Sequence, residues 1–174
     1  MKLSALLSLS VSCGLLFAGV RATAVTLEEL HRDATITPQT FARHFSKFRF
    51  VYRADVQKAE DFLASQAGDC DDYATLASSE LTARGYHCRL VAVRMPGLVH
   101  VVCYVAEANG FLDFNLRAKG SGLVSSGPEL ANVADAVAKS FKAQWTSVSE
   151  FTYSEGVKRL VATTVAASEK GQKS

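Results

Sequence analysis

A cysteine stands at the predicted start of a helix, within the stretch GDCDDYA at residues 68–74. Asp69 is a favourable N-cap residue and Asp72 follows three positions later, so we predict a helix from Cys70 to about residue 84. At a helix start, unpaired backbone N–H groups and the positive end of the helix dipole stabilise a thiolate, the nucleophilic form of cysteine. The stretch therefore predicts a nucleophile. The alternative is a structural cysteine, because free cysteine is among the most buried residue types.

Three carboxylates surround this thiol in the sequence. Asp69, Asp71 and Asp72 would disfavour the thiolate unless a positive charge offset them. A bound cation or a nearby imidazolium could supply that charge. The alternative is that these carboxylates only cap the helix and face solvent.

Chain lengths indicate which histidine can serve Cys70. A helix over residues 70–84 runs about 22 Å away from the thiol, and the predicted strand over residues 86–94 returns about 28 Å. The turn predicted at Pro96-Gly97 therefore lies near the thiol, and His100 follows that turn, whereas His87 would lie at the far end. A lone histidine in an apolar strand is more often a core residue, but this position opposite a helix-start cysteine favours His100 as the general base.

A third side chain should hold the imidazole in the correct tautomer. Asp113 and Asn115 are the candidates, because they lie two residues apart on the next predicted strand and share a face. A hairpin loop over residues 107–110 would bring Asn115 diagonal to His100, and a loop over residues 106–109 would bring Asp113 there. A tight turn at Asn109-Gly110 would bring Arg117 instead. The sequence leaves these three registers open.

The elements around these residues predict an α+β domain over residues 25–165. Helices come first and are followed by an antiparallel meander into which one later helix is inserted, so the Cys70 helix should pack against the sheet. The predicted helices cover residues 25–32, 37–48, 55–66, 70–84 and 128–141. The predicted strands cover residues 86–94, 98–105, 111–115, 145–153 and 157–165, with a Gly/Ser-rich loop at 119–127 and a disordered tail at 166–174.

The N-terminus has the pattern of a secretory signal peptide. Lys2 precedes an apolar segment over residues 3–20, and Ala22-Thr23-Ala24 is a small-x-small cleavage site. We therefore expect cleavage after Ala24, a secreted or periplasmic product and no stable membrane insertion. Residues 1–24 contain two basic and no acidic residues, so their loss leaves 17 basic and 17 acidic residues. This balance and the lack of a basic stripe argue against a nucleic-acid partner.

Three cysteines remain after such cleavage. An odd number in an oxidising compartment leaves at least one thiol unpaired. Cys88 and Cys103 lie on neighbouring predicted strands and could pair with each other. Cys70 would then be the free thiol.

The motifs resemble those of one enzyme family. GDCDDYA at 68–74, HVV at 100–102 and FLDFN at 111–115 together resemble the bacterial transglutaminase-like cysteine proteinases, which belong to the transglutaminase-like and papain-like superfamily. The resemblance covers roughly residues 66–116. It implies a papain-like fold and a Cys-His-Asp triad at Cys70, His100 and, most simply, Asp113. The spacing from His100 to Asp113 is shorter than is usual in the family, and Asn115 lies nearer the usual distance.

The resemblance also implies an activity. A cysteine peptidase or amidase would act on a protein or peptide substrate by acyl transfer and would need no cofactor. In some relatives the acidic residues beside the cysteine bind calcium, and Asp69 and Asp71 occupy those positions here. Two other functions remain open: a protein-crosslinking transglutaminase, and a non-catalytic secreted binding domain that uses the acidic loop.

Overall fold

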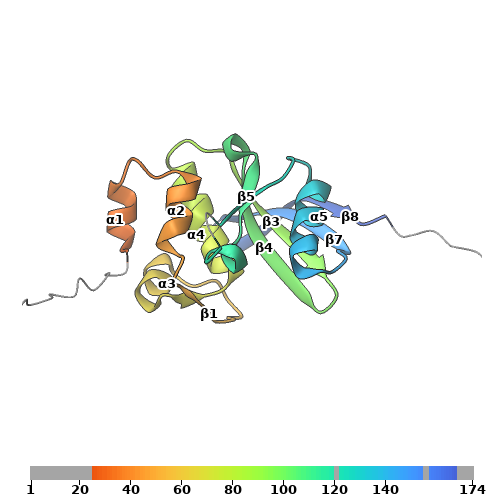
Figure 1. Cartoon of the computed structure of the whole chain (residues 1–174), viewed down its shortest axis with the longest axis horizontal. Helices are drawn as coiled ribbons and strands as arrows, with labels where there is room; N and C mark the ends of the chain where they lie inside the picture. The colour runs from red at the N-terminus through yellow and green to blue at the C-terminus, as the bar shows by residue number, and fades with distance from the viewer. Residues whose placement is uncertain (1–24, 120–121, 155–156, 168–174) are drawn as a thin grey trace, which may run out of the picture.

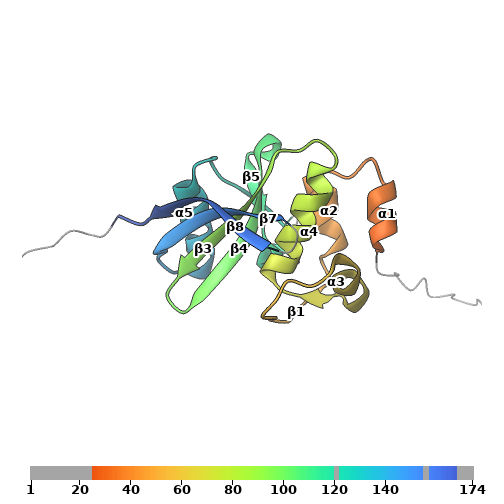
Figure 2. The same cartoon turned by 180° about the vertical axis from the view of Figure 1, so that it is seen from behind.

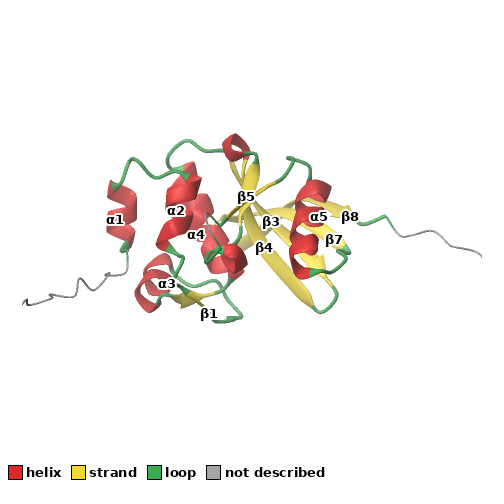
Figure 3. Cartoon of the chain, in the orientation of Figure 1, coloured by secondary structure: helices red, strands yellow, loops and turns green. Residues whose placement is uncertain are grey.

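Helices form the first part of the chain and an antiparallel sheet forms the second, as Figure 1 and Figure 3 show. The computed structural model describes residues 25–119, 122–154 and 157–167. The expected signal peptide at 1–24 and most of the expected tail, residues 168–174, lie outside these ranges. The α+β class is confirmed. The helices are α1 (Leu27–Arg32), α2 (Pro38–His44), α3 (Ala59–Ser65), α4 (Cys70–Thr82) and α5 (Leu130–Phe141), with 3-10 helices η1 (Ala106–Ala108) and η2 (Phe114–Leu116).

Six strands make the main sheet of the described residues, in the order β6-β5-β4-β3-β7-β8. Every neighbouring pair is antiparallel. The strands are β3 (Cys88–Met95), β4 (Leu98–Val105), β5 (Gly110–Leu112), β6 (Leu123–Ser125), β7 (Ser147–Ser154) and β8 (Val157–Val165). A separate parallel pair joins β1 (Arg49–Phe50) to β2 (Ala67–Gly68) beside the start of α4.

Both faces of the central strands are buried. Alternate residues of β3 point to opposite faces, so Leu90 joins the core under α4, whereas Val91 joins the core under α5. Figure 1 shows α5 over one face of the sheet, and Figure 2 shows β7 and β8 from the opposite side. This double burial explains the nearly continuous apolar character of β3 and β4. The predicted packing of the Cys70 helix on the sheet is confirmed, because α4 contacts β3 and β4.

An aromatic cluster joins α2 and α3 to α4. Tyr73 of α4 lies 5.6 Å from Phe41 and 5.1 Å from Phe45, measured between ring centroids. Phe62 of α3 stacks on Phe45 at 5.7 Å, and Phe114 of η2 lies 5.4 Å from Tyr73. These rings are all buried. These phenylalanines therefore form core and fix the start of α4 against η2.

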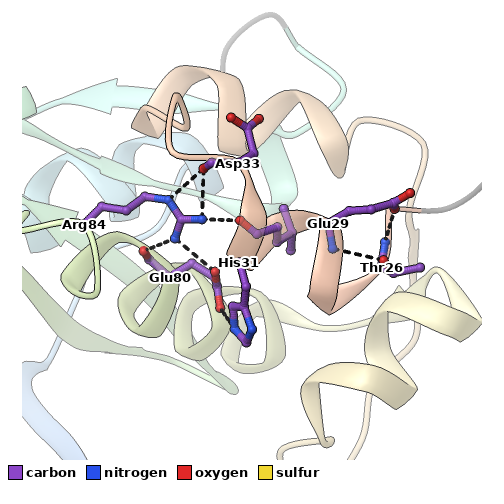
Figure 4. A network of polar contacts seen from close by, with 7 residues as sticks. Thr26, Glu29, His31, Asp33, Glu80 and Arg84 are labelled. Atoms are coloured by element: carbon purple, nitrogen blue, oxygen red, sulfur yellow. Dashed lines mark hydrogen bonds and ion pairs between the residues drawn. The ribbon is translucent and has the colours of Figure 1, made fainter.

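A buried carboxylate fastens α1 to the end of α4 (Figure 4). Glu80 is 2% exposed and pairs with Arg84 at 3.1 Å and with Nε2 of His31 at 2.8 Å. Arg84 also donates to the backbone carbonyls of Leu30 and Asp33. The network satisfies a charge that would otherwise be costly to bury.

Three predicted helix starts were wrong, and the first of these helices, expected from residue 25, begins at Leu27. The helix expected from Asp55 begins at Ala59, because the backbone N–H of Gln57 donates to Asp72 of α4 at 2.6 Å and holds the segment before Ala59 against that helix. The helix expected from Pro128 begins at Leu130, and Glu129 is its N-cap. In addition, α4 ends at Thr82 rather than near residue 84.

The strand expected over residues 111–115 ends at Leu112, because Asp113 caps η2 and turns the chain away from the sheet. The Gly/Ser-rich segment is also not wholly a loop, since it contains β6, which pairs with β5. A Cβ at Gly110 would lie 2.4 Å from the carbonyl oxygen of Val124, so the glycine allows this close pairing. No helix in the described ranges is long and apolar enough to cross a membrane.

Candidate active site

The start of α4 is held by a reciprocal capping box, which confirms the predicted cap. Asp69 is the N-cap residue and accepts from the Asp71 backbone N–H at 3.3 Å. Asp72 accepts from the Asp69 backbone N–H at 3.0 Å. Cys70 is therefore the first helical residue, and its side chain is half-buried.

Gly68 brings the preceding strand close against this cap. A Cβ at this position would lie 2.4 Å from Oδ2 of Asp72 and 2.7 Å from the ring of Phe62. Its carbonyl accepts from the Val51 backbone N–H at 2.8 Å, which ties the cap to the segment after β1. The preceding helix α3 ends earlier, at Ser65, so the glycine does not terminate it and instead permits close packing.

Strand β4 passes directly beside the Cys70 sulfur. The backbone N–H of Val101 points at Sγ of Cys70, with an N-to-Sγ distance of 3.5 Å. The preceding residue, His100, is 3% exposed, and its Nε2 lies 2.9 Å from Oδ1 of Asp113. The fold thus brings together Cys70, His100 and Asp113 from α4, β4 and the end of β5.

The hairpin after β4 adopts one of the three registers left open by the sequence. Val105 pairs with Gly110, so the loop covers residues 106–109. This register carries Asp113 toward His100, and the Asp113 carboxylate is fully buried. Asn115 is exposed and contributes only its backbone N–H, which donates to Oδ1 of Asp113 at 2.8 Å. Arg117 points away, because it donates to the carbonyls of Phe48 and Phe114.

The site favours the protonated, positively charged form of His100. Burial opposes the charged imidazolium, but hydrogen bonds to Asp113 and Cys70 outweigh it and raise the pKa of His100 to about 9. The ring of Phe141, at the end of α5, packs edge-on against the imidazole at 4.9 Å. The sequence predicted only a helix that ends at Phe141, so this contact was missed.

The carboxylates around Cys70 differ in whether their oxygens accept hydrogen bonds. Ligand oxygens of Asp69, Asp71 and Asp72 lie within 4.8 Å of one another. Asp69 and Asp72 accept hydrogen bonds from the backbone of Arg53 and Gln57, whereas Oδ1 of Asp71 is buried without a partner among the described residues. Burial, together with the Asp69 and Asp72 carboxylates, raises the pKa of Asp71 to about 7.

This donor set could hold a hard divalent cation. Calcium prefers six to eight oxygen ligands, and carboxylates are the usual protein donors. The unpartnered Asp71 oxygen fits such a ligand, while Asp69 and Asp72 would have to share oxygens already used in capping. Asp71 would therefore be the principal ligand and Asp69 a secondary one.

An open cleft of about 870 Å³ lies beside Cys70 and His100. Cys70, His100, Asn115 and Phe141 are among the residues that line it. The N-terminal segment at residues 50–54 forms one wall. The tip of the β3–β4 hairpin, residues 94–99, forms the other.

The other cysteines lie away from this cleft. Cys88 is half-buried and Cys103 is buried, and both are free thiols that contact each other across β3 and β4. The hydrogen bond from this contact lowers the pKa of Cys88 and, with burial, raises that of Cys103. His87 lies at the far end of β3, where it pairs with Glu107.

Comparison of the chain with protein-family models and with curated proteins gives no match.

Proposed function

We propose that the protein is a thiol hydrolase, a cysteine peptidase or amidase of the transglutaminase-like type with a papain-like fold. One observation carries this proposal: a helix-start cysteine and a histidine line an open cleft, and the imidazole lies 2.9 Å from the buried carboxylate of Asp113 behind it. These are the parts of a nucleophile, a general base and an orienting group.

In the proposed reaction, Cys70 is a thiolate paired with the His100 imidazolium, and it attacks the carbonyl carbon of an amide. Backbone N–H groups at the start of α4 stabilise the oxyanion. The His100 imidazolium then protonates the leaving amine, which leaves a thioester on Cys70. Water, activated by His100, hydrolyses the thioester and frees the thiol. Asp113 holds the ring and stabilises its charged form throughout.

The same thioester could pass to an amine instead of water, which would make the protein a transglutaminase. We favour hydrolysis because the sequence motifs resemble those of the proteinases. The signal peptide predicted at residues 1–24 would place the reaction outside the cytoplasm.

The test is incubation of the purified protein with an unfolded protein, such as reduced and alkylated casein, with and without a primary amine. Mass spectrometry should find new peptide carboxylates with wild-type protein and none with Cys70→Ala. Cys88→Ser is the matched control and should cleave normally. Amine-linked products in place of carboxylates would indicate transamidation. Equal products from wild type and Cys70→Ala would overturn the proposal.

A further inference from the structure

Exposed apolar side chains gather on the two walls of the Cys70 cleft. The described residues include eight large apolar side chains that are exposed, and four of these line the cleft. Phe50 and Tyr52 come from the N-terminal wall and are 51% and 77% exposed. Leu98 and Val99 come from the hairpin wall and are 39% and 42% exposed. Exposed apolar groups that cluster in a concave site usually contact a ligand.

The backbone of β4 is also open in this cleft. Backbone groups of consecutive strand residues point to opposite edges, and the Val101 N–H points at Cys70 rather than toward β3. Val99 therefore directs its N–H and carbonyl to the same edge as Val101. Within the described ranges, β5 pairs with β4 only at residues 103–105, so no strand covers this edge at Val99.

These two features constrain the substrate. An extended chain could hydrogen-bond to the Val99 backbone as an added strand, and its carbonyl groups would then pass the Cys70 sulfur two residues farther along. Its side chains would project alternately toward the two walls. A small amide would use neither the open strand edge nor the apolar walls.

Building on the proposed function, we infer that the substrate is an extended polypeptide segment with a bulky apolar side chain close to the scissile bond, held between Phe50 and Tyr52 on one wall and Leu98 and Val99 on the other.

The experiment uses a mixed library of short peptides from a denatured proteome digest, with cleaved sites identified by mass spectrometry. Wild-type protein should enrich bulky apolar residues within three positions of the cut. Tyr52→Ser and Leu98→Ser should each cut these peptides about tenfold more slowly, which corresponds to about 1.4 kcal/mol of lost binding. Val165→Ser, which removes a side chain that is 70% exposed on β8 and does not line the cleft, should cleave like wild type.

Alkylation of Cys70 by iodoacetamide distinguishes failure of the inferred substrate class from failure of the proposed function. All three variants should be alkylated at the wild-type rate, because none contacts the thiol. Fast alkylation without cleavage of any peptide, or cut sites without apolar enrichment, would overturn the substrate class but leave the reactive thiol in place. Slow alkylation of wild-type Cys70 together with no cleavage would instead overturn the proposed function.

Discussion

The backbone amide of Val101 points at Sγ of Cys70 from 3.5 Å, and the residue before it, His100, is the proposed base. One short piece of β4 therefore contacts the thiol twice, once through its backbone and once through a side chain. The hairpin turn at residues 96–97 and the pairing of β4 with β3 fix this piece. The position of the thiol relative to the base thus depends on how α4 packs against the sheet.

We predict that Cys70 is the fast-reacting thiol of the protein. It alone among the described cysteines combines a helix start with a histidine in contact. Brief treatment with iodoacetamide at neutral pH, followed by peptide mapping, should find Cys70 labelled at least about tenfold faster than an unperturbed thiol.

Cys88 provides the control for this prediction, because its pKa is lowered by the hydrogen bond to Cys103. Cys88→Ser should leave the fast phase intact, whereas Cys70→Ala should remove it. Preferential labelling of Cys88 in the wild type would favour a binding domain over an enzyme.

We predict that Asp113, and not Asn115, sets the charge state of His100. Loss of the carboxylate in Asp113→Asn should bring the pKa of His100 down from about 9 toward its ordinary value. The rate of Cys70 alkylation at neutral pH should fall by about tenfold or more, the scale of about 1.4 kcal/mol of lost ion-pair stabilisation. Asn115→Ala is the matched control and should change little, because Asn115 offers Asp113 only its backbone N–H.

The same pair should make stability depend on pH. The folded pKa of His100 is raised, so its contribution is complete below about pH 6.5, the ordinary histidine value, and is lost as the pH rises through about 9. Thermal melting from pH 6 to pH 10 should show this decline in the wild type and a weaker one in Asp113→Asn. Identical profiles would show that the two residues are not coupled.

The parts of the site that depend on local sequence were predictable. The capping box at Asp69 and Asp72 and the turn at Pro96-Gly97 each follow from short-range preferences, and the structure has both. His100 could be chosen over His87 from chain lengths alone, because a helix and a returning strand of known rise leave little freedom.

Whether Asp113 or Asn115 is the partner of His100 could not be predicted from local sequence. It depends on the hairpin register, because moving the four-residue loop by one position shifts the pairing by two residues and exchanges Asp113 with Asn115 beside His100. The register is fixed by η1 and by the close packing of Gly110 on β6, a strand hidden in a segment that has loop-like composition. The Phe141 contact was also beyond sequence reasoning, since it requires knowing that α5 ends over His100.

We predict that the buried Glu80 network contributes strongly to stability. Arg84→Ala leaves a carboxylate that is 2% exposed without its guanidinium partner, and breaking such a buried pair typically costs about 3 kcal/mol or more. Urea unfolding followed by circular dichroism should measure the loss. The control is Glu28→Gln in the exposed pair with Arg32, which should change the free energy of unfolding by less than about 1 kcal/mol. Equal effects of the two substitutions would contradict the role assigned to the network.

The last prediction is that calcium binds at the start of α4 through Asp71. The three clustered carboxylates repel one another, and the buried Oδ1 of Asp71 has no partner in the described part of the chain. Calcium at about a hundredfold excess over its Kd would stabilise the folded state by about 2.7 kcal/mol, so it should raise the melting temperature. Magnesium should not reproduce the shift, because it dehydrates reluctantly and demands a stricter octahedral geometry. Asp71→Asn should abolish the response while keeping the capping box, which uses the side chains of Asp69 and Asp72. A melting temperature indifferent to both calcium and chelator would leave these carboxylates as helix caps and a solvated edge of the cleft.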